Sequence, residues 1–229
     1  MSDTASALLA QYAKLTEFLG LVLGPDYEIA LHDLTDANRS ITAIANSHIS
    51  GRKIGAPLTN MALSVLRSKS YEQSDYLLHY YGLSVNGKEL RSNTFFIKHE
   101  GRPIGMLCVN FDDSRYRDAA ERILQLCHPD AFAAPRQTEA ELSAPPTNIP
   151  ERFMNSPEAV VADAVRGELE RLGVMPDRLT TEERLAVIAA LEETGIFLIK
   201  GAVRDVAAEL RCSQASVYRY LSNMRNGGI

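Results

Sequence analysis

Hydrophobic and polar positions along this 229-residue chain follow two periods, one typical of helices and one typical of strands. Residues 5–23 repeat apolar side chains at steps of three and four, which predicts an amphipathic helix that Gly24 and Pro25 end. Its apolar face consists of Leu8, Tyr12, Leu15, Leu19 and Val22. This face either pairs with a second copy of the chain or docks on the chain's own sheet.

Four segments downstream have the pattern of β-strands, and two more have helical spacing. The strand segments are residues 28–33, 41–46, 93–99 and 103–111, the helical segments are 57–69 and 114–127, and residues 71–83 are rich in tyrosine. Glu100-Gly101-Arg102 is expected to join the last two strands in a tight hairpin. This order predicts an α+β fold, a PAS-like mixed sheet with flanking helices on one side.

A proline-rich stretch, residues 129–156, divides the chain into two parts. It contains five of the ten prolines and almost no aliphatic residues, which predicts an extended, mobile linker. The expected domains are therefore a sheet domain at 1–128 and a small all-α domain at 157–229.

The second domain contains local signals for helix starts. Ser156 precedes Pro157 as an expected N-cap, and proline is harmless at the first helical position. Thr180 and Glu183 have the spacing of a capping box, and Gly195 is expected to end the helix that follows. These helices would give the carboxyl-terminal motif enough apolar surface to fold.

The last thirty residues predict a helix-turn-helix. Apolar residues share one face of each of two short helices, and Arg211-Cys212-Ser213 forms the turn between them. The faces consist of Val203, Val206, Ala207 and Leu210 in the first helix, and of Val217, Leu221 and Met224 in the second. Ser213 is expected to cap the second helix. The opposite face presents Ala215, Arg219 and Ser222, which are short or forked side chains suited to a major groove.

Side-chain chemistry predicts a role for each residue of this motif. Ser213, Gln214 and Ser216 lie where free amides and the helix dipole favour a phosphate oxygen. Arg219 can grip guanine O6 and N7, and Ala215 can touch a thymine methyl group. Lys200, Arg204 and Tyr218 are expected to contact the DNA backbone. In the alternative interpretation, this unit packs against another protein.

The formal net charge of −5 is unevenly distributed along the chain. Residues 200–229 contain five basic and two acidic side chains, a balance of +3, so the remainder has a balance of −8. The basic end attracts phosphate, and the acidic remainder discourages indiscriminate binding.

Two parts of the chain each resemble a known protein family. Residues 45–52, 54–59 and 105–112 resemble the YheO-like PAS family. The region from Thr180 through Tyr218-Arg219-Tyr220-Leu221 is similar to the DauR-like helix-turn-helix, which is joined to such PAS domains in bacterial transcription regulators. The combined resemblance implies a one-component regulator in which a sensory domain controls a DNA-binding domain.

Polar residues near apolar strands are candidates for holding a small-molecule effector. They are His32, Asn46, His48 and Asn110, and the alternative role for each is a structural hydrogen bond. We expect no bound metal and no obligatory cofactor, since no histidine spacing supports haem ligation. Cys108, Cys127 and Cys212 are too far apart to suggest zinc and are expected to be reduced thiols.

Common catalytic motifs are absent from the sequence, which contains no nucleophile elbow, P-loop, dinucleotide fingerprint or HExxH pair. We therefore expect a DNA-binding transcription regulator rather than an enzyme, and a repressor rather than an activator, because blocking polymerase requires only occupancy of the site. Its PAS-like domain is expected to sense a small molecule or to mediate oligomerisation. The alternative is a first domain with its own enzymatic activity and an appended regulatory or protein-interaction domain. No apolar run reaches the ~18 residues that span a bilayer, so a cytoplasmic protein without membrane contact is expected.

A homodimer or higher homo-oligomer is expected to bind double-stranded DNA, because one recognition helix reads too short a site.

Overall fold

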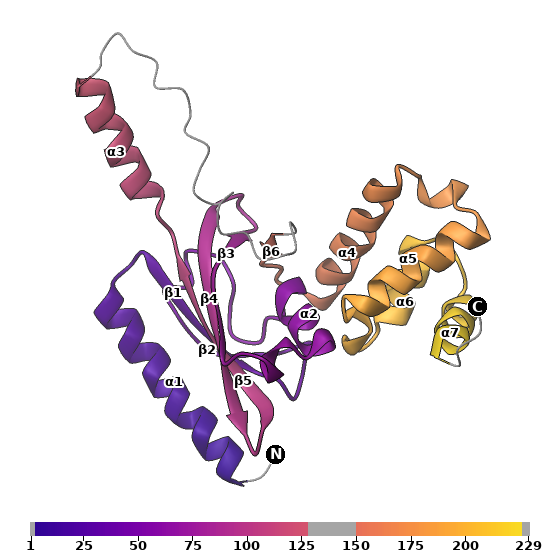
Figure 1. Ribbon diagram of the computed structural model, residues 1–229, viewed down its shortest axis with the longest axis horizontal. Helices are drawn as coiled ribbons and strands as arrows, with labels where there is room; N and C mark the ends of the chain where they lie inside the picture. The colour runs from indigo at the N-terminus through magenta and orange to yellow at the C-terminus, as the bar shows by residue number, and fades with distance from the viewer. Residues whose placement is uncertain (1–2, 128–149, 226–229) are drawn as a thin grey trace.

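The computed structural model describes residues 3–127 and 150–225, which form a sheet domain followed by a helical domain (Figure 1). The sheet consists of β1 (Tyr27–Asp33), β2 (Ile41–Ala45), β3 (Tyr76–Leu83), β4 (Glu89–His99), β5 (Arg102–Phe111) and β6 (Glu151–Arg152). Their order is β2-β1-β5-β4-β3-β6, and all neighbours are antiparallel except β3 and β6, which are parallel. The predicted mixed sheet and α+β class are confirmed.

The predicted hairpin between β4 and β5 is present. His99 pairs with Arg102, so two residues, Glu100 and Gly101, make the turn. Both have positive φ, 50° and 75°, which is the conformation of a type I′ turn. The tyrosine-rich segment contains most of the short 3₁₀ helix η1 (Ser70–Glu72) and all of β3.

One face of the sheet is covered by α1 (Asp3–Leu23). Leu9 packs there against Ile29 and Leu31, which alternate along β1 with residues of the other face. Gly20 approaches β2 so closely that an added Cβ would lie 2.3 Å from Ala45 Cβ. The helix therefore docks on its own sheet.

The predicted apolar face of α1 is only partly correct. Leu8, Tyr12 and Leu19 pack on the sheet, but Leu15 is 37% exposed and Val22 is 61% exposed. The buried side of the helix is centred on Ala5, Leu9, Thr16 and Gly20, so Leu15 and Val22 lie at its margin or beyond it.

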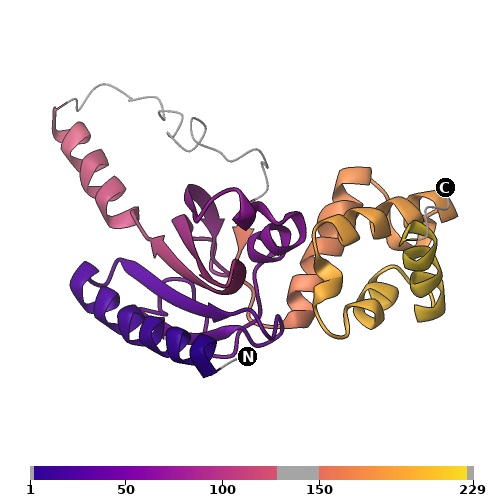
Figure 2. The ribbon, with the colours of Figure 1, turned by 60° about the horizontal axis from the view of Figure 1, so that its bottom comes forward.

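The opposite face of the sheet is covered by residues 46–59 and by α2 (Asn60–Ser68). Leu58 and Leu63 are fully buried there, in one core with Ala30 and Met106 of the sheet. Helices therefore lie on both faces, and the expectation that they lie on one side is wrong (Figure 2).

Helix α3 (Ser114–Cys127) projects away from the sheet (Figure 1). Its first turn is tied down by Tyr116, whose ring lies 5.4 Å from that of Phe111. Residues 115–127 are all exposed, so the predicted apolar side of this helix is not buried by the described part of the chain.

The predicted linker extends over residues 129–156, of which 129–149 lie outside the described residues. Its end is part of the fold, because β6 pairs with the outer side of β3 and Glu151 is buried. Asn60 holds this strand on both sides: its Nδ2 donates to the Pro150 carbonyl at 3.0 Å, and its Oδ1 accepts from the Arg152 N–H at 2.8 Å. The expectation of an extended, mobile segment does not describe residues 150–156.

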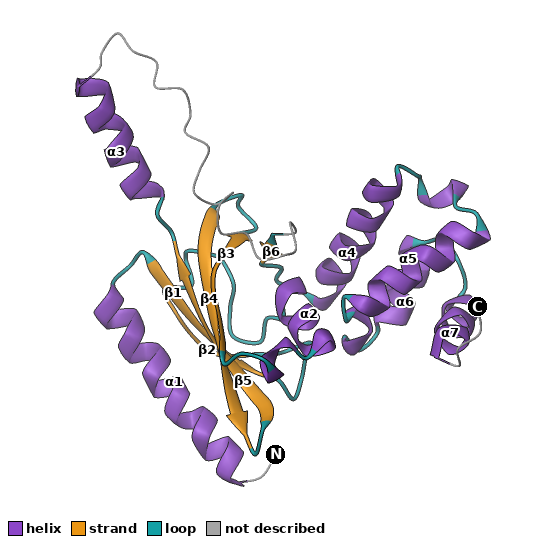
Figure 3. Cartoon of the chain, viewed as in Figure 1, coloured by secondary structure: helices purple, strands orange, loops and turns teal. Residues whose placement is uncertain are grey.

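The helical domain contains four α-helices, all in the described range 157–225 (Figure 3). They are α4 (Pro157–Leu172), α5 (Thr181–Glu193), α6 (Ala202–Glu209) and α7 (Gln214–Arg225), with the 3₁₀ helices η3 (Pro176–Arg178) and η4 (Ile196–Leu198) between them. The Ser156 cap and the capping box of Thr180 and Glu183 are confirmed.

The two domains share one hydrophobic core. Leu63 of α2 belongs to the same buried cluster as Ile188 of α5 and Val206 of α6. Gly195 packs so closely on α2 that an added Cβ would lie 2.8 Å from the Leu63 carbonyl oxygen. Arg67 and Glu192 form an ion pair at 3.0 Å across the same contact. The helical domain is therefore packed directly against the sheet domain.

Candidate nucleic-acid interface

The turn between α6 and α7 is built from backbone hydrogen bonds. The Cys212 N–H donates to the Ala207 carbonyl at 2.9 Å, and the Arg211 N–H donates to the Ala208 carbonyl at 3.2 Å. This pair of bonds is a Schellman motif, which usually has glycine at the position that Arg211 occupies with φ 49°. The motif ends α6 and turns the chain sharply toward α7.

Helix α7 begins as the sequence predicts. Ser213 Oγ accepts from the Ser216 N–H at 3.1 Å and lies 2.9 Å from Ser216 Oγ. Val217 and Leu221 are buried, and Met224 is half-buried against the same core. Tyr220 is also buried, which the apolar spacing did not indicate.

The apolar face of α6 is also the predicted one. Val206, Ala207 and Leu210 are buried, and half-buried Val203 packs against the same core. Helix α4 packs against α6, and α5 packs against α7. The two helices of the motif are therefore held by the rest of the helical domain.

The residues assigned to DNA lie on the outer side of the motif. Ser216 is half-exposed, and the others are exposed: Lys200, Arg204, Ser213, Gln214, Ala215, Tyr218, Arg219 and Ser222. The Arg219 guanidinium lies 5.5 Å from the centroid of the Tyr220 ring, a cation–π contact. It makes no ion pair within the described residues.

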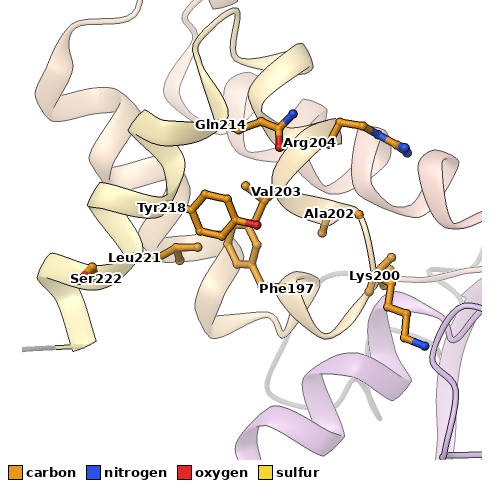
Figure 4. A pocket seen from close by; sticks show the side chains of 11 residues that line it. Phe197, Lys200, Ala202, Val203, Arg204, Gln214, Tyr218, Leu221 and Ser222 are labelled. Atoms are coloured by element: carbon orange, nitrogen blue, oxygen red, sulfur yellow. The ribbon is translucent and has the colours of Figure 1, made fainter.

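A groove of about 570 Å³ lies between the start of α6 and the outer side of α7 (Figure 4). Its floor is apolar, with Phe197, Val203 and Leu221. Five of the residues assigned to DNA line it: Lys200, Arg204, Gln214, Tyr218 and Ser222. The structure thus brings side chains from both helices and from the loop before α6 to one concave surface.

Arg204 is engaged by acidic neighbours. Its Nε donates to Asp205 Oδ1 at 2.7 Å, and a terminal nitrogen lies 3.9 Å from Glu158 Oε1. The hydrogen bond to Asp205 raises the pKa of Arg204, and the side chain remains exposed. Contact with phosphate would therefore compete with the pairing to Asp205.

The four candidate effector residues fall into two groups. Asn46 and His48 lie at the corner between α1 and β1, where they bind backbone carbonyls. Asn46 Nδ2 donates to Gly20, Gly24 and Tyr27 at 2.8–3.1 Å, and so caps the end of α1. Asn46 and His48 are thus occupied by structural hydrogen bonds.

His32 and Asn110, in contrast, are buried on the sheet face opposite α1. His32 Nδ1 lies 2.9 Å from Ser40 Oγ, and Asn110 Nδ2 donates to Glu28 Oε1 at 3.1 Å. Burial, with a smaller effect of the Arg52 charge, lowers the pKa of His32 well below its usual value.

The charged residues of this interior were not predicted from the sequence. Glu28, Arg52 and Glu151 are all buried on the same side of the sheet. Glu28 is a polar residue at the start of an apolar strand. Asn110 became a candidate because it is likewise a polar residue within an apolar strand, so the same weak signal could have indicated Glu28. Arg52 and Glu151 lie in segments without regular apolar spacing, so no local pattern indicated their burial.

Metal and thiol chemistry find little support in the described residues. Within 3–127 and 150–225, no three His, Cys, Asp or Glu side chains are grouped to hold a metal ion. Cys108 is buried in the sheet, and burial raises its pKa to about 12, so it is a protonated core residue at neutral pH. No helix in the same ranges is long and apolar enough to cross a membrane.

The fold and this surface define the class: a PAS-like sheet domain joined to a helix-turn-helix domain. The family model described as YheO-like PAS domain matches residues 3–128, and a model described as HTH domain matches residues 160–222. The chain belongs to the YheO-like PAS family and carries a helix-turn-helix domain, as the sequence resemblance implied.

Relatives match across nearly the whole chain. The uncharacterized protein YheO of Escherichia coli K12 is 28% identical over 221 residues, covering 96% of this chain and 86% of the relative. A protein of Haemophilus influenzae is 28% identical over 226 residues, with 98% and 94% covered. The transcriptional regulator DauR of Pseudomonas aeruginosa is 26% identical over 230 residues, with both chains fully covered. The chain is thus similar to its relatives in both domains.

Proposed function

We propose that this protein is a sequence-specific DNA-binding transcriptional repressor whose sheet domain senses a small molecule. The observation that supports this function most directly is the two-sided character of α7. Val217 and Leu221 are buried, while Ala215 and Arg219 on the other side are exposed. A helix whose buried face is packed on the domain core, and whose exposed face carries short and forked side chains, can enter a major groove of DNA. The name of the relative DauR agrees with a regulatory role.

In this proposal Arg219 reads a base, because its planar fork matches guanine O6 and N7. Ala215 lies one turn before it and contacts a thymine methyl group. Ser222 lies three residues further along the exposed face and reaches the same groove. Two or three base contacts specify a short half-site only.

The groove between α6 and α7 then receives the sugar-phosphate backbone. Helix α6 begins at Ala202, after Gly201, which has φ 89° and no side chain to cap the helix. The N–H groups of Ala202 and Arg204 already donate to the carbonyls of Ile199 and Gly201, so the side chains supply most of the contact. Lys200 and Arg204 flank this helix start, and Gln214 and Tyr218 face it from α7. Cations beside the positive end of a helix dipole favour a phosphate contact.

A homodimer supplies the second half-site. The exposed apolar residues of α3, Ile123, Leu124 and Leu126, are 49–84% exposed. An isolated helix of 14 residues is marginally stable in water, so α3 gains stability from a covering partner. We assign that role to the same helix of a second copy, because two-fold pairing also supplies the second recognition helix.

The test of the proposed function is genomic footprinting of the intact protein, followed by binding titrations on a recovered site. Arg219→Ala is expected to weaken specific binding by about 1–3 kcal/mol and to relax preference at one base position. Lys200→Ala is expected to weaken all sequences alike and to lower the salt dependence of log K by about one unit. Arg178→Ala, an exposed arginine on η3, is the matched control and should leave binding unchanged. Unchanged binding in both test variants would exclude this DNA interface.

A further inference from the structure

A row of polar side chains crosses the sheet on the face opposite α1. Glu28 of β1 is paired with Asn110 of β5, Asn110 with Ser92 of β4, and Ser92 with Tyr80 of β3. Residues directly opposite one another in a ladder project from the same face of the sheet. All four are buried. One level of the inner face is therefore polar across four strands.

Two buried charged residues from segments outside these four strands lie next to this polar row. Arg52 comes from the segment before α2 and is 2% exposed, and Glu151 comes from β6 and is 3% exposed. The Arg52 guanidinium donates to the Pro57 carbonyl and lies 6.0 Å from the centroid of the Phe153 ring. Glu151 Oε1 accepts from Thr59 Oγ1 at 2.7 Å. On the sheet side, the carboxylate of Glu151 also interacts with the hydroxyl groups of Tyr80 and Ser92.

Four buried polar atoms of this cluster have no hydrogen-bond partner of good geometry among the described residues: Arg52 Nε, Ser92 Oγ, Asn110 Oδ1 and Glu151 Oε2. The side chains of Ser92 and Glu151 nevertheless interact with each other, so the atoms without any partner are Arg52 Nε and Asn110 Oδ1. The amide of Asn110 is oriented by its donation to Glu28 Oε1, so its free atom is the carbonyl oxygen. A buried polar atom without a partner is costly, and most such atoms in native proteins are satisfied by the chain, water or a ligand.

These atoms have a definite chemical character. Asn110 Oδ1 and Glu151 Oε2 are acceptors that require N–H or O–H donors, while the Arg52 Nε–H is a donor that requires an acceptor. Arg52 also lies between two carboxylates, Glu28 and Glu151, and burial raises the pKa of each. With both carboxylates ionised, the cluster has an excess of one negative charge, which burial disfavours. A compact cation with several N–H donors would satisfy the acceptors and neutralise this charge.

We propose that the cluster of Glu28, Arg52, Ser92, Asn110 and Glu151 is the effector site, and that it binds a small primary ammonium compound with an adjacent oxygen acceptor. The ammonium group donates to Glu151 Oε2 and Asn110 Oδ1, and the oxygen accepts from Arg52 Nε. This inference rests on the proposed regulatory function and identifies where its effector binds.

Occupancy of this site acts directly on the DNA-binding domain. Glu151 is six residues before the first residue of α4, and β6 leads into that helix through the Ser156 cap. Arg152 forms an ion pair with Asp163 of α4 at 3.3 Å, and Asn60 binds the backbone on both sides of Glu151. A ligand that pulls on Glu151 therefore alters the position of β6, and with it the start of α4.

The test is a thermal unfolding titration of the full-length protein without DNA. Ethanolamine, protonated at pH 7.5, is the probe, and ethylene glycol and sodium chloride at equal concentrations are the controls. Ethanolamine alone is expected to raise the unfolding midpoint, by about 3 °C at ten times its Kd and in proportion to the logarithm of its concentration above that. An increase of the same size with ethylene glycol would overturn the ammonium assignment.

Glu151→Gln is the decisive variant, because the amide keeps an oxygen for Thr59 and replaces the free acceptor with a donor. It is expected to weaken ethanolamine binding at least tenfold, as is Asn110→Ala, which removes the other ammonium acceptor and serves if the first variant does not fold. Glu193→Gln, at an exposed position of α5, should bind as the parent does. An unfolding midpoint of the parent that does not respond to ethanolamine, or equal binding in the variants, would overturn the proposal, as would a crystal soaked in ethanolamine that shows only water at the four atoms.

Failure of this inference is distinguishable from failure of the proposed function. Arg219→Ala lies outside the cluster and should bind ethanolamine normally while losing specific DNA binding. A protein that binds its operator through Arg219 but ignores ethanolamine would retain the repressor function and lose this effector site.

Discussion

The side chain of Asn38 makes two hydrogen bonds with the backbone of Lys200, 162 residues further along the chain. The Lys200 N–H donates to Asn38 Oδ1 at 2.9 Å, and Asn38 Nδ2 donates to the Lys200 carbonyl at 3.1 Å. Asn38 lies in the loop between β1 and β2, and Lys200 immediately precedes Gly201 and α6. The start of the helix-turn-helix is thereby fixed to the sheet domain at a point where phosphate contact is proposed.

Asn38→Ala removes both hydrogen bonds between the domains. The site is exposed, so water replaces the lost partners, and we expect the free energy of unfolding to fall by about 1 kcal/mol. DNA affinity should change by less than the Arg219→Ala variant changes it, because no DNA contact is removed. Urea unfolding and a binding titration measure both effects. Asn155→Ala, at another exposed asparagine, is the control and should be neutral; an equal loss there would show that the Asn38 contact contributes nothing specific.

Asp205→Asn frees Arg204 from its acidic partner. The hydrogen bond at 2.7 Å is weakened, and one negative charge leaves the proposed interface. We expect tighter binding to all DNA sequences, with a steeper dependence of log K on salt. Glu209→Gln removes an equal charge from the same helix without touching Arg204, so it should have a smaller effect. If the two variants behave alike, only net charge matters and Arg204 has no backbone contact.

Ile123→Asp introduces a charge into the exposed apolar side of α3, where Ile123 is 60% exposed. If α3 pairs with its counterpart in a second copy, burial of this carboxylate is costly and the dimer should dissociate at least tenfold more readily. Sedimentation velocity across a concentration series measures this change. Gln125→Glu adds a similar charge to the same helix without removing an apolar side chain, and should be milder. A parent protein that stays monomeric at all concentrations would refute the pairing.

His32→Gln tests the buried histidine through the pH dependence of stability. Because the pKa of His32 is lowered in the folded protein, the unfolded chain takes up a proton below pH 6.5 that the folded chain does not. Stability should therefore fall with decreasing pH, by about 1.4 kcal/mol for this group between pH 7.5 and 5.5. The His32→Gln variant should not show this loss of stability.

Urea unfolding of both proteins at the two pH values isolates the effect, since Glu28 and Glu151 are present in both. The raised pKa values of these two carboxyl groups change stability in the opposite direction. The folded state binds a proton more tightly than the unfolded chain there, so these groups stabilise the fold as the pH decreases. Identical pH dependence in parent and variant would mean that His32 titrates normally.

Local sequence signals predicted most of the helical domain. Caps at Ser156, Thr180 and Ser213 act over three or four residues, so they are visible without knowledge of the fold. The buried faces of α6 and α7 follow from helical period alone. The exposed positions of Ala215 and Arg219 follow from the same geometry, although their contact with DNA remains a prediction.

The sheet domain was predicted in outline and missed in its interior. Most strand segments along the chain and the hairpin near Gly101 have short-range signals, but the order of strands in the sheet does not. Strand β6 consists of two polar residues and pairs with the otherwise unpaired edge of β3. Asn46 was a candidate ligand by its position after a strand. The structure places it in a left-handed conformation, φ 55°, where it caps α1.

The sequence by itself determined the two domains, the periods of their elements and the helix-turn-helix, because these depend on interactions between residues close along the chain. Tertiary structure decided which groups meet inside the sheet domain and how the two domains join. Glu28, Arg52 and Glu151 are brought together by strand register and by a strand that follows the long segment after α3. Contacts of this kind leave no local period, because each partner is chosen by the fold and not by its neighbours in sequence.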